Sequence, residues 1–245
     1  MSSKPSIIFV PGAWHSEVHV QPFVGPMEQL EYRVVPVVLE SNKRLVLWDE
    51  NVKVILHAIQ AEVEAGHKVC VVGHSVSGIS VVLALSKFFE TASAEQKQQI
   101  VQVLFIACFF DAIRSTSEID WYDLNFDTGV PNLGEAKLIR PAEEVFYNDM
   151  PATEAKPFVA ALKMNTAQMP PEDLVERVKI VRAGCKRICY FVCLKDKAIA
   201  PKFQRLEAEE AGFEAVEIDQ DHCPMVTQPK TLADEFHKVL STVAS

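Results

Sequence analysis

The amino-acid sequence predicts an α/β protein in which a mostly parallel, six-stranded sheet is flanked by helices on both faces. Short apolar runs alternate with longer segments of helical periodicity along most of the chain. The runs lack the polar alternation of a strand with one face in water, so we expect both faces of the sheet to be buried. The chain has 245 residues, of which 49% are hydrophobic and 23% charged. These values fit one large domain with a substantial core over residues 1–245.

Six apolar runs are the expected strands. The first run ends at Pro11-Gly12, and Pro36 interrupts the second, which is otherwise rich in valine. Parallel strands of this kind need right-handed crossover connections between them. In chain order, the expected strands are residues 6–10, 32–39, 68–72, 101–109, 188–194 and 214–218.

Segments of helical spacing lie between these runs and after the last one. Residues 48–65 place Val52, Ile55 and Ile59 on one face, and Gly66 follows the end of the segment. Apolar positions three and four residues apart are typical of a helix packed on a core, and glycine commonly follows a helix end. Two more helices are expected at residues 79–87 and 231–243.

One long stretch, between Asp111 and about Pro171, contains no run that reads as a core strand. A segment of this length is too long for a simple loop. We therefore predict an inserted helical cap over residues 112–170, with short helices near 141–148 and 152–164. Its aromatic side chains suit an apolar substrate pocket, and they would serve plain packing equally well. They are Trp121, Tyr122, Phe126, Phe146, Tyr147 and Phe158.

Charge and cysteine usage narrow the classes of partner. The formal net charge is −9 with no basic block, so neither nucleic acid nor an anionic membrane surface is an expected partner. No apolar segment reaches the length of a membrane span, and the N-terminus has no signal-peptide pattern. Of the six cysteines, Cys185, Cys189 and Cys193 are evenly spaced, but no C-x-x-C pair or matched histidines accompany them, so no metal site is expected. We expect a cytoplasmic protein with reduced thiols that acts on a small molecule, and the oligomeric state stays open, a homodimer included.

One strand-to-helix turn carries the pattern of a catalytic serine. Residues 73–78 read Gly-His-Ser-Val-Ser-Gly between a predicted strand and a predicted helix. A serine at such a sharp turn has its hydroxyl lifted into a cleft, and its strained backbone needs small neighbours. Two glycines and Ser77 supply them, although Ser77 stands where the usual pattern has glycine. A plain turn of small residues is the alternative, and the rest of the chain favours Ser75 as a nucleophile.

A serine hydroxyl is a weak nucleophile that needs a base, which a carboxylate orients in turn. Asp196 follows one predicted strand and His222 follows the last one, so both join Ser75 at the carboxyl ends of parallel strands, where ligands gather. Asp111, just past the strand at 101–109, is an alternative acid. The motif around Asp196 favours it over Asp111.

Acyl transfer also needs donors for the developing oxyanion. One expected donor is the backbone amide of Val76, directly after the nucleophile. The other is the amide of Ala13, in the turn where Gly12 permits close approach of the backbone. For the turn at Gly12 and Ala13, the alternative is a simple turn that ends the strand. For His15, the alternative to substrate contact is packing within the loop. The candidate substrate-binding residues of this turn and the cap are Gly12, Trp14, His15, Trp121 and Phe146.

These segments together resemble the α/β-hydrolase superfamily. The matching pieces are Val-Pro-Gly-Ala-Trp-His at 10–15, Gly-His-Ser at 73–75, Asp196 with Ala-Ile-Ala-Pro at 198–201, and His-Cys-Pro-Met at 222–225. The sequence is most similar to small cap-bearing members related to plant methyl esterases and hydroxynitrile lyases. The resemblance spans nearly the whole chain and is weakest across the first half of the cap.

The resemblance implies a Ser75–Asp196–His222 triad, oxyanion amides at Ala13 and Val76, and no cofactor. The leading hypothesis is a serine hydrolase that cleaves a carboxylic ester or related acyl bond of a small to medium apolar or aromatic substrate through an acyl-enzyme. Two residues depart from the usual pattern. Ser77 stands where the pattern has glycine, and Pro11 stands where many relatives carry histidine.

Two other functions stay open. The first is a lyase that uses the same triad for proton transfer. In the hydroxynitrile lyases that the chain resembles, a threonine takes the place of Gly12 and a lysine directly follows the histidine, where this chain has Cys223. Without that cation, cyanide release is disfavoured, whereas other carbon–carbon cleavages remain open. The second is a ligand-binding receptor on the same fold, since a fold does not determine function.

Overall fold

The computed structural model describes residues 4–110, 120–131, 133–185 and 187–241, and its core is one parallel sheet. Along the sheet the strands lie in the order β2-β1-β3-β4-β8-β9, and each neighbouring pair is parallel, which confirms the predicted class. The strands are β1 (Ser6–Val10), β2 (Val34–Pro36), β3 (Val69–His74), β4 (Ile100–Ile106), β8 (Ile188–Cys193) and β9 (Glu214–Ile218).

The second strand is shorter than the predicted run of residues 32–39. β2 lies at the edge of the sheet and pairs with β1 alone. Proline has no N–H to donate, so within sheets it is confined to edges and strand ends. Pro36 is accordingly the last residue of β2.

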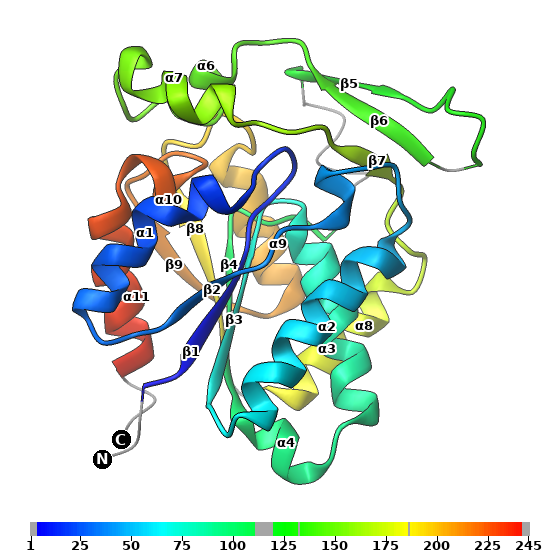
Figure 1. The fold of residues 1–245 in the computed structure, drawn as a ribbon, viewed down its shortest axis with the longest axis vertical. Coiled ribbons are helices and arrows are strands. Elements are labelled where there is room, and N and C mark those ends of the chain that lie inside the picture. The colour runs from blue at the N-terminus through cyan, green and yellow to red at the C-terminus, as the bar shows by residue number, and fades with distance from the viewer. Residues whose placement is uncertain (1–3, 111–119, 132, 186, 242–245) are drawn as a thin grey trace.

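Helices cover both faces of the sheet (Figure 1). The sequence predicted three of these helices, α2 (Trp48–Glu64), α3 (Ser77–Thr91) and α11 (Pro229–Ser241). It did not predict α1 (Glu17–Gln29), α8 (Leu174–Gly184) or α9 (Pro201–Ala211). Pro22 and Pro26 lie inside α1 and obscure its pattern. One face carries α1 (Glu17–Gln29), α10 (Pro224–Thr227) and α11 (Pro229–Ser241). The other carries α2 (Trp48–Glu64), α3 (Ser77–Thr91), α8 (Leu174–Gly184) and α9 (Pro201–Ala211), while η1 (Glu40–Asn42) and α4 (Ala94–Gln99) are short connectors.

The cap lies across the carboxyl ends of the main strands (Figure 1). Its helices α6 (Ala142–Val145) and α7 (Ala152–Ala160) lie within the two segments predicted to be helical. The cap also contains an antiparallel sheet that was not predicted, made of β5 (Tyr122–Asn125), β6 (Leu133–Leu138) and β7 (Thr166–Gln168). These strands are short and of mixed polarity, so they produce no clear alternation in sequence. Asp111 and the first cap residues, 112–119, lie outside the described residues.

Three further expectations concern the cysteines, a metal site and a membrane-spanning helix. All six cysteines are buried and free. No cluster of three or more His, Cys, Asp or Glu side chains suited to a metal ion occurs within the described ranges. In that same part of the chain, none of the helices combines the length and apolar character that a bilayer crossing requires.

Candidate active site

Ser75 occupies the turn between β3 and α3 in a strained backbone conformation. Its φ is +56°, in the left-handed region that non-glycine residues rarely adopt. The Ser75 amide donates to Ile106 O of β4 at 2.9 Å, which ties the turn to the centre of the sheet. A strained residue held by its surroundings is typical of a functional position.

The small neighbours of Ser75 have separate structural reasons. A side chain at Gly78 would place its Cβ 2.8 Å from the Cβ of Cys108, so close packing excludes any larger residue there. Ser77, which replaces the usual glycine, does more than fit. Its hydroxyl donates to Val10 O of β1 at 2.7 Å and accepts from the His74 amide at 2.8 Å. The serine therefore ties the turn to β1.

Asp196 and His222 meet at the carboxyl ends of β8 and β9. His222 Nδ1 lies 2.7 Å from Asp196 Oδ2, and both side chains are almost fully buried. Because an ionised carboxylate can only accept, Nδ1 carries the proton and Nε2 keeps its lone pair for a base role. No hydrogen bond joins the Ser75 hydroxyl to His222 in the described part of the chain, and catalytic hydrogen bonds often tighten only when substrate is bound.

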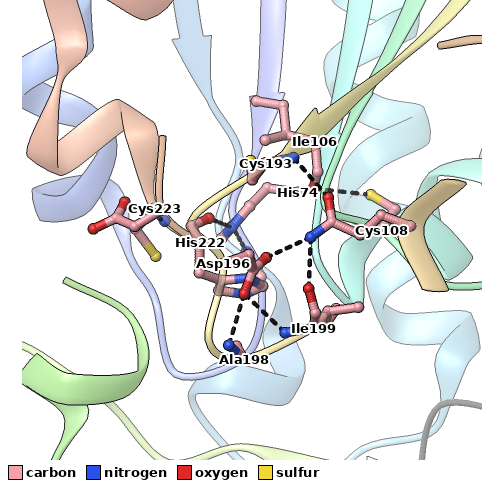
Figure 2. A network of polar contacts seen from close by, with 12 residues as sticks. His74, Ile106, Cys108, Cys193, Asp196, Ala198, Ile199, His222 and Cys223 are labelled. Atoms are coloured by element: carbon pink, nitrogen blue, oxygen red, sulfur yellow. Dashed lines mark hydrogen bonds and ion pairs between the residues drawn. The ribbon is translucent and has the colours of Figure 1, made fainter. Parts of the chain in front are cut away.

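Three further groups hold the Asp196 carboxylate (Figure 2). Oδ1 accepts from the amides of Ala198 and Ile199 at 2.7 and 2.8 Å, and Oδ2 also accepts from Gln204 Nε2 at 2.8 Å. The Gln204 side chain is itself held, since its Oε1 accepts from the Cys193 amide at 2.8 Å. The carboxylate is therefore fully hydrogen-bonded in one orientation, with one oxygen directed at the imidazole.

The turn after β1 lies against Ser75. A Cβ at Gly12 would lie 2.7 Å from Ser75 Cβ, so only glycine allows this approach. The amide of Gly12 donates to His74 Nδ1 at 3.2 Å, and that of Trp14 to Asn42 Oδ1 at 3.2 Å. The amides of Ala13 and Val76 have no acceptor among the described residues. They are the two amides that the sequence predicts as oxyanion donors.

His74 connects this turn to the His222 loop. Its Nδ1 accepts from Gly12, and its Nε2 donates to His222 O at 2.9 Å. Burial holds the pKa of His74 well below its usual value, and the nearby His222 lowers it further. His74 is therefore a neutral bridge beneath the site, because a protonated ring would give Gly12 N–H no acceptor.

His15 is buried behind the same turn. Its Nδ1 donates to Ala13 O at 2.6 Å, and its Nε2 faces Tyr147 Oη at 3.0 Å and Cys223 Sγ at 3.2 Å. Burial is the main cause that lowers the His15 pKa well below its usual range, and the neighbouring His19 and His74 add to it. Both ring nitrogens are thus engaged within the protein, and the ring joins the turn to the cap and to the His222 loop.

A cavity opens beside Ser75 beneath the cap. It comprises about 750 Å³ of space between protein atoms, part of it open to solvent. Of the candidate site residues, five line it, namely Ala13, Trp14, Ser75, Val76 and Trp121. The other five do not, namely Asp196, His222, Gly12, His15 and Phe146. The remaining wall is largely apolar, with Trp48, Ile79, Phe109, Leu124, Phe126 and Ile199 among its members. None of the described lining residues carries a charge.

The tryptophans of this wall have their polar atoms engaged elsewhere. The indole N–H groups of Trp14 and Trp121 donate to Ala136 O at 3.2 Å and to Ala198 O at 2.9 Å. Trp121 thereby links the cap to the loop that follows Asp196. The indoles accordingly present apolar surface to the cavity.

Phe146 lies against the His222 imidazole rather than in the cavity wall. Its ring stacks on the His222 ring at a centroid distance of 5.6 Å, and the side chain is 1% exposed.

Sequence reasoning missed the parts played by Asn42, Gln204 and His74. No local pattern marks them, because each acts through contacts with segments distant in the sequence.

The fold and geometry agree with a comparison against known protein families. A sequence model described as the Alpha/beta hydrolase family matches residues 7–235.

The chain belongs to this family.

Two curated relatives and one solved structure place this α/β-hydrolase among similar proteins. It is 26% identical over 243 residues to Alpha/beta hydrolase nvfD of Aspergillus novofumigatus (strain IBT 16806), covering 92% of each chain. It is 23% identical over 198 residues to Methyl jasmonate esterase 1 of Vitis vinifera, covering 73% of this chain and 72% of that protein. The crystal structure of polyneuridine aldehyde esterase is similar with a TM-score of 0.76 at 16% identity, covering 99% of this chain and all of the other, and this likeness shows the shared fold.

Proposed function

We propose that this α/β-hydrolase cleaves uncharged carboxylic esters with an apolar or aromatic acyl part, through an acyl-enzyme on Ser75. The observation that carries the proposal is a strained serine that shares one cavity with two unbonded amides, those of Ala13 and Val76. Preorganised amides beside a nucleophile suit the negative charge that develops on a carbonyl oxygen during acyl transfer.

The proposed first step transfers the acyl group to the enzyme. Ser75 Oγ bonds to the ester carbonyl carbon while His222 Nε2 takes the serine proton, and the carbonyl electron pair moves to oxygen. The amides of Ala13 and Val76 bind that oxyanion. Collapse restores the carbonyl, breaks the bond to the alcohol oxygen and returns the proton from His222 to the leaving alcohol.

Water completes the cycle. His222 takes a proton from water as the hydroxide oxygen bonds to the acyl carbon, and collapse releases the carboxylic acid with the proton returned to Ser75. Asp196 holds the imidazole in the tautomer that both steps need. No step requires a metal or cofactor.

The substrate class follows from the cavity wall. A charge placed among these apolar residues would lose its hydration without gaining a partner, so an uncharged substrate is favoured. The ester bond is supported by the similarity to Methyl jasmonate esterase 1, an esterase by name. A lyase that expels cyanide is disfavoured, because no cation occurs among the described lining residues and Cys223 takes the place of a lysine.

The test combines labelling with turnover. A fluorophosphonate probe should label the wild type at Ser75, and neutral aryl esters should be hydrolysed. Ser75→Ala should lose labelling and at least about 10³-fold of kcat. Ser86→Ala is a matched control, because Ser86 lies on α3 and its hydroxyl donates to Leu83 O of the same helix at 3.0 Å. Folded wild-type protein that is neither labelled nor active on esters would contradict the proposal, and labelling without ester turnover would favour another acyl reaction or the lyase.

A further inference from the structure

The turn that follows β1 is held with almost every backbone polar group engaged. We call residues 11–16 the oxyanion loop. Within it the amides of Gly12, Trp14 and Ser16 donate to side chains of His74, Asn42 and His19. The His15 amide donates to Gly12 O at 3.3 Å, and Pro11 has no amide hydrogen. The one loop amide without an acceptor among the described residues is that of Ala13.

Asn42 makes more of these contacts than any other described side chain. Its Nδ2 donates to Gly12 O at 2.9 Å and to His15 O at 2.9 Å, and its Oδ1 accepts from the Trp14 amide at 3.2 Å. The residue is 1% exposed, so these contacts are shielded from competing water. Both amide hydrogens and the carbonyl oxygen of this side chain are therefore used on one loop, 27 to 30 residues away in the sequence.

The contact with Gly12 O bears directly on the proposed oxyanion donor. The carbonyl of Gly12 and the N–H of Ala13 belong to the same peptide group, which is planar and trans. The two bonds point in opposite directions, so holding the carbonyl oxygen sets the direction of the N–H. We propose that Asn42 is a positioning residue that aims the Ala13 amide at the developing oxyanion, a role that rests on the proposed ester hydrolysis.

The conformation of Trp14 explains why such a clamp is needed. Trp14 has a φ of +62°, which costs free energy for a residue with a side chain, so the loop has a tendency to relax. Rotation of the peptide groups on either side of Ala13 is the simplest relaxation, and it would turn the Ala13 N–H away. Asn42 opposes it by binding Gly12 O on one side of Ala13 and the Trp14 amide on the other.

A second buried asparagine, which supports the short helix η1 that carries Asn42, supplies a matched control. Asn51 on α2 is also 1% exposed, and it anchors η1 through the Ser41 amide and the Ser41 hydroxyl, both at 3.0 Å. Asn51 supports the same short helix, and both hydrogen bonds that its side chain makes with described residues go to Ser41 and not to the oxyanion loop. A merely structural role for Asn42 would make substitutions at the two asparagines equivalent in their effect on kcat.

The experiment compares Asn42→Asp, Asn42→Ala and Asn51→Asp on a neutral aryl ester. Aspartate keeps the acceptor for Trp14 but places an oxygen against two carbonyl oxygens, so Asn42→Asp should lower kcat about 10- to 100-fold, with KM within twofold. Alanine leaves room for water to bind those carbonyls, so Asn42→Ala should lose less kcat even though it removes more atoms. Asn51→Asp should lower the melting temperature while keeping kcat within threefold.

A second measurement isolates the oxyanion contact. A trifluoromethyl ketone adds to the serine as an anionic tetrahedral adduct, whereas the matching methyl ketone binds without that charge. In Asn42→Asp the inhibition constant of the trifluoromethyl ketone should rise by the factor by which kcat/KM falls, and that of the methyl ketone should stay within twofold. If the aspartate variant does not fold, the same pair of inhibitors on Asn42→Ala provides the test.

Three outcomes would overturn this role for Asn42. They are an unchanged kcat in both Asn42 variants, an equal loss of kcat in Asn51→Asp, and equal weakening of both ketones. If one of these outcomes is found, and wild-type turnover is nevertheless lost in Ser75→Ala, the Asn42 role is refuted and the proposed ester hydrolysis stands. A wild type that is neither labelled nor active would refute the proposed function and, with it, the Asn42 role.

Discussion

The Nδ1 of His222 lies 2.7 Å from Oδ2 of Asp196, and this contact determines which ring nitrogen is left to act as a base. The carboxylate is held by Ala198, Ile199 and Gln204 as well, so it cannot rotate to another partner without leaving them unbonded. An imidazole whose Nδ1–H is held by a carboxylate leaves Nε2 as the ring nitrogen that can accept a proton.

Replacing the acid should expose this dependence. Asp196→Asn should lower kcat about 10³- to 10⁴-fold, because an amide in that place favours the wrong imidazole tautomer. Asp219→Asn is the matched control on the His222 loop, since that side chain is 76% exposed and pairs with Lys195 at the surface. Steady-state kinetics on a neutral aryl ester, with melting temperatures beside them, measure the difference. Equal kcat values in the two variants would argue against Asp196 as the triad acid.

The approach of Gly12 to Ser75 gives a second prediction. Gly12→Ala should destabilise the fold by about 1–3 kcal/mol through overpacking, and kcat should fall at least about tenfold, because the new Cβ must displace Ser75 or the loop. Gly25→Ala is the control, since Gly25 lies within α1 and its Cβ would meet nothing within 4 Å. That variant should gain about 0.5–1 kcal/mol and keep its activity. Urea unfolding and kinetics would check both, and a fully active Gly12→Ala would contradict the assigned packing.

The buried histidines predict a loss of stability in mild acid. The pKa values of His15, His74 and His19 are lowered, mainly by burial, so below pH 6.5 the unfolded chain binds protons that the folded protein does not. Asp221 acts in the opposite direction. Burial raises its pKa from 3.8 to about 6, so the folded protein takes up one proton first as the pH falls through 6.

The three histidines together should change the free energy of unfolding more than the one aspartate does. Between pH 7.5 and 5.5 the free energy of unfolding should fall, because each proton that only the unfolded chain binds is worth up to about 1.4 kcal/mol per pH unit, and three histidines lose stability in this range against one aspartate that gains it. Urea titrations at the two pH values measure this change. A variant of an exposed histidine, His57→Gln, should show the same pH dependence as the wild type. Stability that is constant or rises toward pH 5.5 would show that these rings are not held neutral.

The uncharged cavity wall predicts discrimination between substrates. A neutral aryl butyrate should be turned over with a kcat/KM at least about 100-fold higher than the aryl hemisuccinate, which carries a carboxylate on the acyl chain, because burying an unpaired charge costs several kcal/mol. The same leaving group on both esters keeps the chemical step comparable. Equal specificity constants would place the acyl chain outside this cavity.

Local features of the fold were predictable from the sequence. The strands and the Ser75 turn are visible there because each depends on a few consecutive residues, such as an apolar run or a cluster of small residues around a strained serine. The antiparallel sheet of the cap was not predictable, since β7 has only three residues and β6 contains Gly134 and charged side chains.

The amino-acid sequence by itself therefore determined the doubly wound sheet, the serine turn and the strand ends from which Asp196 and His222 project. Only the tertiary structure decided which polar side chains support them: Asn42 under the Ala13 peptide, Gln204 on Asp196, and His74 between Gly12 and the His222 loop. The physical reason is that a hydrogen bond acts over about 3 Å whatever the separation along the chain. A contact such as that of Asn42 with Gly12, 30 residues apart, is created when the strands pair and the loops meet.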